Sequence, residues 1–138
     1  MTDPISDLKT CASATQESAD SLNGTFTLIG ERLRALGLCT PAWIHLPVST
    51  PADDWWLGFS KVNGAWSLAV RRGVGPAFTD PVILRSAPLL VRAAAAHALN
   101  RLLGELVVAS ELAVTTLREA DMAAAAFMRS LPQGEPHD

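Results

Sequence analysis

Cysteine is scarce in this chain of 138 residues, which contains only Cys11 and Cys39. The two lie far apart and form no Cys-x-x-Cys motif, so the sequence has neither a disulfide framework nor the spacing of a zinc site. We therefore expect two reduced thiols, no metal ion and no other cofactor.

Long apolar runs are missing as well. No segment approaches the ~18 consecutive apolar residues that a membrane span requires. The opening stretch, MTDPISDLKT, lacks the basic and apolar regions of a signal peptide. These absences predict a cytoplasmic protein without a membrane partner. Apolar residues nevertheless make up 49% of the chain and charged residues 18%, a composition that predicts a folded domain rather than disorder.

Recognisable catalytic motifs are also absent. The chain contains no phosphate-binding loop, no HExxH zinc motif, no GxSxG nucleophile elbow and no GxGxxG after a strand. Only three histidines occur, and His45 is the best candidate for a general base because Asp53 or Asp54 would orient it if the intervening loop folded back. We favour a non-enzymatic protein and assign no catalytic residue.

Charge is distributed unevenly along the chain. The net charge is −3, which argues against a general nucleic-acid binder. Residues 1–21 sum to −3, residues 22–103 to +4 and residues 104–138 to −4. The basic middle would attract an anionic partner or the acidic ends of the same or a neighbouring chain, and we favour neutralisation within the chain.

The pair Asn63-Gly64 predicts a β-hairpin over residues 55–72. A two-residue Asn-Gly loop suits a type I′ turn, whose positive φ angles cost glycine nothing and asparagine little. The turn sets a register in which Phe59 lies opposite Leu68. Because strand side chains alternate between faces, this register divides the hairpin into a large apolar face and a face of small residues.

The apolar face of the hairpin is predicted to line the core. Its members are Trp55, Leu57, Phe59, Trp66, Leu68 and Val70, with the stem of Lys61 at the edge. The opposite face is predicted to be flat and nearly bare. Its members are Gly58, Ser60, Val62, Ala65, Ser67 and Ala69, with Trp56 and Arg71 paired at the open end. A bare face suits close packing of a helix or a second chain, or contact with solvent, and we favour these over a ligand platform.

Shorter elements are predicted on either side of the hairpin. The apolar spacing indicates a helix over residues 25–36 that ends at Gly37. Short strands are expected over residues 42–46 and 82–85, and loops over residues 47–54 and 73–81. Residues 1–21 are predicted to be a flexible arm or a weak helix that starts at Asp3-Pro4, residues 22–131 a single domain, and residues 132–138 a disordered tail.

A long helical segment follows over residues 87–129, with Ser86 as its N-cap and Pro132 after its end. An unbroken helix of this length would measure ~65 Å, whereas a compact chain of this size is about 40 Å across. We therefore expect either a break between His97 and Gly104 or a partner for the helix.

Apolar and small residues in this segment follow the 3-4 spacing of a coiled-coil seam. The seam consists of Leu103, Leu106, Ser110, Ala113, Leu117, Ala120, Ala124 and Phe127. Small residues allow helices to approach closely but bury little area per layer. Two interpretations stay open: packing within the chain, and a modest homodimer or larger assembly.

A second candidate surface combines one aromatic residue with several arginines. The fold could gather Trp56, Arg71, Arg72, Arg85 and Arg92 at the open end of the hairpin and the start of the long helix. Such a group could hold a phosphate or carboxylate and stack a ring. The simpler interpretation, which we favour, is a cross-strand cation–π pair between Trp56 and Arg71.

Together these patterns predict a two-layer α+β fold, with three or four antiparallel strands packed by an N-terminal helix and long Ala-rich C-terminal helices. The leading functional hypothesis is a non-enzymatic interaction protein that self-associates, as a dimer first, through the C-terminal helix and binds a protein partner. The alternative is binding of a small anionic, nucleotide-like ligand through Trp56 and the neighbouring arginines.

Overall fold

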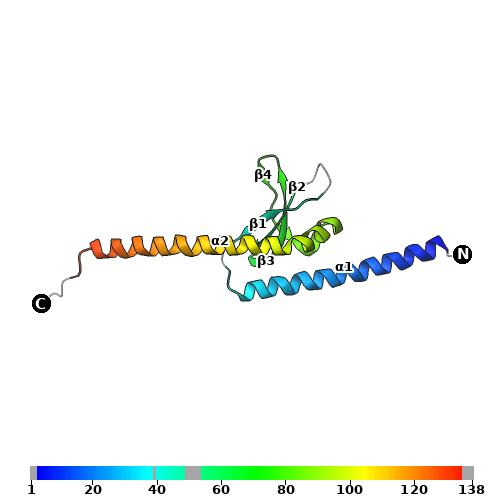
Figure 1. Ribbon diagram of the computed structural model, residues 1–138, viewed down its shortest axis with the longest axis horizontal. Helices are drawn as coiled ribbons and strands as arrows, with labels where there is room; N and C mark the ends of the chain where they lie inside the picture. Colours follow the sequence, from blue (N-terminus) through cyan, green and yellow to red (C-terminus); the bar gives the residue numbers. More distant parts are fainter. Residues whose placement is uncertain (1–2, 39, 49–53, 135–138) are drawn as a thin grey trace.

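Two long helices and a small antiparallel sheet make up the computed structural model, which describes residues 3–38, 40–48 and 54–134. The chain runs through α1 (Pro4–Ala35), β1 (Ala42–His45), β2 (Asp54–Val62), β3 (Ala65–Val74), β4 (Ala77–Phe78), β5 (Val82–Ile83), the short 3-10 helix η1 (Leu84–Ser86) and α2 (Leu89–Ser130) (Figure 1). The strand order is β1-β2-β3-β4, with β5 also paired to β3. The predicted two-layer α+β fold is confirmed.

The hairpin of β2 and β3 has the predicted turn and register. Asn63 and Gly64 adopt φ angles of 51° and 84°, the left-handed values that a type I′ turn requires. Phe59 pairs with Leu68, and the ladder extends from Val62–Ala65 at the turn to Asp54–Gly73 at the open end. A local turn signal therefore decided the register of the two longest strands.

The core lies between both helices and one face of the sheet, called here the inner face. α1 packs against β3, while α2 packs against β1 and β2. Leu57, Phe59 and Val70 are fully buried on the inner face. The prediction of this face is confirmed, although its two tryptophans, Trp55 and Trp66, are only half-buried at the margin of the core.

The other face of the sheet, called here the outer face, is not bare, and that prediction is wrong. Trp43 of β1 lies over Gly58, so closely that a Cβ on Gly58 would overlap its ring. Ala69, the cross-strand neighbour of Gly58, is fully buried. Gly58 therefore makes room for an aromatic side chain of the neighbouring strand.

The first helix begins much earlier than the predicted residue 25. Asp3 caps it by accepting a hydrogen bond from the backbone N–H of Ile5 at 3.2 Å, and Pro4 occupies the first turn. The helix ends as expected, with Gly37 at a φ of 74°. Residues 4–21 are thus helical, and α1 is continuous over 32 residues.

The second helix is also continuous, so of the two alternatives expected, a break between His97 and Gly104 or a partner for an unbroken helix, the break does not occur. α2 spans 42 residues, which corresponds to ~63 Å. Its start differs from the prediction as well, because Ser86 belongs to η1 and the N-cap position is Pro88, which supplies no side-chain bond. Alanine-rich sequence has enough helix propensity to carry one exposed glycine without a break.

The short strands differ from the prediction in detail. β1 ends at His45, and the strand expected over residues 82–85 stops at Ile83, because Leu84 turns into η1. The segment expected to be a loop over residues 73–81 contains β4, which pairs with the end of β3. Most of the loop predicted over residues 47–54 lies outside the described residues.

The two helices run in the same direction under the sheet but are displaced along their axes (Figure 1). The N-terminal part of α1 projects beyond the sheet on one side, and the C-terminal part of α2 projects on the opposite side. The buried residues agree, because α1 buries only Phe26 and Gly30, and α2 buries none after Leu106. Each helix is therefore half covered.

Candidate functional sites: the uncovered half of α2 and an aromatic cluster

The projecting part of α2 is the largest uncovered feature of the protein. Between residue 107 and Ser130 the helix continues for ~36 Å beyond its last buried residue, Leu106. It nevertheless carries large apolar side chains that are about half to two-thirds exposed. They are Val107, Val108, Leu112, Val114, Leu117, Met122, Phe127 and Met128. A monomer rarely exposes so many large apolar side chains on one element.

The predicted seam lies partly before and partly after the point on α2, at Leu106, where burial ends. Leu106 is only 2% exposed and belongs to the core of its own chain. Ser110 and Ala113 are half-buried, whereas Leu117 and Phe127 are each 63% exposed. The predicted interface residues Leu103, Ala120 and Ala124 are also exposed. The chain itself covers the start of the seam and leaves the remainder open.

An apolar groove lies where the projecting half of α2 leaves the domain. Leu33, Leu36 and Leu38 of the α1 C-terminal region form one wall, and Leu103, Leu106, Val107 and Val114 of α2 contribute to the other. The groove encloses about 480 Å³. We call it the root groove. Leu103, Leu106 and Ser110 line the groove and also belong to the predicted seam, so the two surfaces adjoin on α2.

A second cluster occupies the outer face of the sheet around Arg71. Its guanidinium carbon lies 4.1 Å from the centre of the Trp43 ring and 3.9 Å from that of Phe78. Phe78 also meets Trp56 edge-on, with the ring centres 5.6 Å apart. The predicted pair of Trp56 and Arg71 is adjacent in register, but the rings on which Arg71 stacks are those of Trp43 and Phe78.

The Arg71 cation has no counter-ion in the part of the chain that the structure describes. Its Nε is shielded from solvent and has no acceptor there, and no carboxylate forms an ion pair with it. Desolvation lowers the pKa of Arg71 below its ordinary value, although an arginine remains charged at physiological pH. Contact with two ring faces offsets part of the desolvation.

His45 and Asp54 meet at the margin of this cluster. The His45 Nε2 lies 2.6 Å from Asp54 Oδ1, and the Trp56 indole N–H donates to Asp54 Oδ2 at 3.3 Å. Asp54 is one of the two carboxylates that the sequence offered as a partner for His45, and the structure places it there; Asp53, the other, lies outside the described residues. Both side chains of the pair are about half exposed.

The other residues predicted to bind a ligand lie apart from one another. Arg72 points to the inner face and lies over Trp55, with 5.6 Å between guanidinium and ring centre. Arg92 of α2 donates to Asn23 of α1 at 3.1 Å. Of the five predicted residues, the structure brings together only Trp56 and Arg71.

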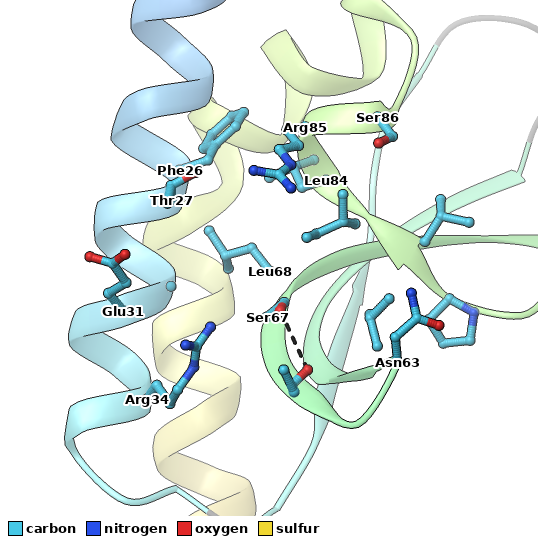
Figure 2. A pocket seen from close by; sticks show the side chains of 16 residues that line it. Phe26, Thr27, Glu31, Arg34, Asn63, Ser67, Leu68, Leu84, Arg85 and Ser86 are labelled. Carbon is cyan, nitrogen blue, oxygen red and sulfur yellow. Dashed lines mark hydrogen bonds between the residues drawn. The ribbon is translucent and has the colours of Figure 1, made fainter.

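Arg85 lines a different hollow, of about 690 Å³, between α1 and the open edge of β3 (Figure 2). Arg34 enters the same hollow from α1 and donates twice to the backbone oxygen of Trp66, at 3.0 and 3.1 Å. These two hydrogen bonds satisfy one backbone carbonyl at a strand edge that is otherwise open.

Sequence reasoning missed Trp43 and Phe78 as members of the outer-face cluster. The alternation of side chains within the strand predicted over residues 42–46 would have placed Trp43 opposite the core. For Phe78 no such signal exists, because β4 has only two residues. Its position depends on the turn at Gly75, whose φ is 59°.

Within the described residues, no three metal-binding side chains come close enough to hold an ion, and no helix is long and apolar enough to span a membrane. Comparison with family models, curated proteins and solved structures gives no match for this chain. Function must therefore be argued from the two surfaces themselves.

Proposed function

We propose that this is a non-enzymatic interaction protein that self-associates through the projecting half of α2 and uses the assembled form to bind a protein partner. The observation that carries the proposal is the set of large apolar side chains, 45% to 71% exposed, on the part of α2 that buries no residue after Leu106. Isolated helices are marginal in water, and most helical stability in proteins comes from packing of an apolar face. A second copy would supply that packing.

The other parts of the molecule are compatible with this role. The projecting half of α1 exposes Ile5 and Leu8, and it offers a separate surface for a protein partner. The proposal places the protein in the cytoplasm, where thiols stay reduced.

Two alanines of α2 give a matched test of self-association. Ala124 lies on the exposed seam, and Ala126, two residues on, lies on the opposite side of the helix. We expect the molar mass from light scattering to fall to the monomer value in Ala124→Glu and to remain that of the assembly in Ala126→Glu. A monomeric mass for the unmodified chain at 100 µM, roughly the weakest useful affinity for such a role, would contradict the proposal.

The second candidate function is binding of a small anion at Arg71, favoured by a specific observation. The guanidinium is held between Trp43 and Phe78, while its Nε has no acceptor among the described residues. A planar guanidinium fixed in this way is well suited to donate hydrogen bonds to two oxygens of a carboxylate or phosphate. Trp56 lies beside it and could stack on an attached ring.

Tryptophan fluorescence tests this second function with inorganic phosphate and pyrophosphate as probes. We expect saturable quenching that Arg71→Ala abolishes and that Arg72→Ala, on the opposite face of the same strand, preserves. Equal quenching in both variants would show that the anion binds elsewhere.

A further inference from the structure

We propose that two copies dock antiparallel, with the end of each projecting α2 helix seated in the root groove of the other copy. This inference deepens the proposed self-association, on which it rests, by naming the occupant of the groove and the direction of the second helix. Three observations support it: the order of large and small residues along α2, the position of the groove and the area available.

Large and small residues alternate in blocks that are nearly symmetrical about Leu117. Leu103 and Leu131 lie 14 residues before and after it. Between Leu106 and Phe127 the seam carries small residues apart from Leu117. A two-fold axis at Leu117 therefore places each large end against the large end of the other copy. Such self-complementarity is what an isologous dimer requires.

The root groove lies at one of these large ends and lacks an occupant. Leu36 is 70% exposed and Leu103 52% exposed, although both line the groove. In the antiparallel arrangement the groove receives Phe127 and Leu131 of the second copy, which are themselves 63% and 42% exposed. A parallel pair would place Phe127 against its own symmetry mate, at the far end of the helix, and would leave both grooves empty.

The area is sufficient for a stable contact. Seven large side chains of α2 on each copy are roughly half exposed, from Leu103 to Leu131 along the seam side. If each hides roughly 70 Å² on docking, the two copies together with their small residues bury on the order of 1,200 Å², the lower end of the range for specific interfaces. The contact would be reversible and sensitive to single substitutions.

Spin-label distances distinguish the directions. In a background of Cys11→Ser and Cys39→Ser, one sample carries a label at Ser130→Cys and another at Glu105→Cys, both on the back of α2. Antiparallel docking predicts about 40 Å between like labels along the helix axis. It predicts roughly 20 Å when the two singly labelled chains are mixed, because helix axes pack 8–10 Å apart.

The measured distances test the direction of docking, the location of the interface and self-association separately. Short distances between like labels and long distances in the mixture would overturn the antiparallel arrangement and leave self-association intact. Long distances in all three samples of a dimer would show that the seam is not the interface. A protein that stays monomeric would refute the proposed function together with this inference.

A groove variant outside α2 gives an independent test. Leu36→Glu changes an exposed residue after the end of α1, and we expect it to raise the dimer dissociation constant at least tenfold without lowering the melting temperature of the monomer. Leu28→Glu, a half-exposed leucine of α1 that does not line the groove, is the matched control and should leave the constant unchanged. In a double-mutant cycle, Leu36→Ala and Phe127→Ala should be coupled; additive effects would show that Phe127 does not reach the groove.

Discussion

The two halves of α2 have similar residues and opposite surroundings. Before residue 107 the helix presents Val91, Ala95 and Leu102 to the sheet, all less than 3% exposed. After it, Leu117 and Phe127 face outward although they continue the same side of the helix. Hydrophobic residues at helical spacing therefore predict a covered side, but they do not say whether the cover comes from the same chain. The comparison can be sharpened by making the same substitution in each half.

Introducing a charge into each half of α2 should give the largest difference in unfolding free energy between the two halves. Ala95→Glu places an unpaired carboxylate at a position with 0% exposure, and we expect it to cost at least ~4 kcal/mol of unfolding free energy or to prevent folding. Ala124→Glu should change the stability of the dilute monomer by less than ~0.5 kcal/mol. Urea titrations followed by circular dichroism measure both.

Removing a large side chain from each half of α2 should give a smaller difference in unfolding free energy between the halves. Leu102→Ala empties a fully buried position and should cost about 2–5 kcal/mol. Leu117→Ala should cost less than ~1 kcal/mol in dilute solution, where no second copy covers it. A loss for Leu117→Ala as large as that for Leu102→Ala would mean that the projecting half is packed even in the monomer, and the distinction between the halves would fail.

A helix-favouring change at the junction should have the smallest effect. Gly104 is exposed, and a Cβ added there would meet no atom within 4 Å. Gly104→Ala should therefore raise the unfolding free energy by ~1 kcal/mol, through helix propensity alone. Thermal unfolding checks this value. A destabilised Gly104→Ala would indicate that the junction must bend, contrary to the continuous helix.

Short-range signals account for the predictions that succeeded. The Asn63-Gly64 turn determined the register of β2 and β3 because positive φ angles at two adjacent residues suit only this turn type. That register, with the alternation of side chains, then identified Leu57 and Phe59 as core residues. Asp3-Pro4 likewise marked the start of α1, although its weak apolar pattern left a mobile arm as an equal alternative.

Predictions that needed contacts between distant segments were wrong or incomplete. The outer face was expected to be bare because the hairpin alone supplies only small residues there, while Trp43 covers it from another strand. Helix length alone left two alternatives open, a break near Gly104 or a partner for an unbroken helix, and the structure shows the unbroken helix. The arginine cluster was dispersed because Arg72, Arg85 and Arg92 found separate partners or surroundings.

By itself, the sequence determined the elements of this protein whose causes are local: the hairpin and its register, the inner face of the sheet and the C-terminal end of α1. Backbone preference and side-chain alternation act over a few residues, so they can be read without knowing the fold. Only the tertiary structure decided how far the sheet covers each helix, which rings enclose Arg71 and where the root groove lies. These depend on the relative positions of segments far apart in the chain, which are set by packing of the whole core.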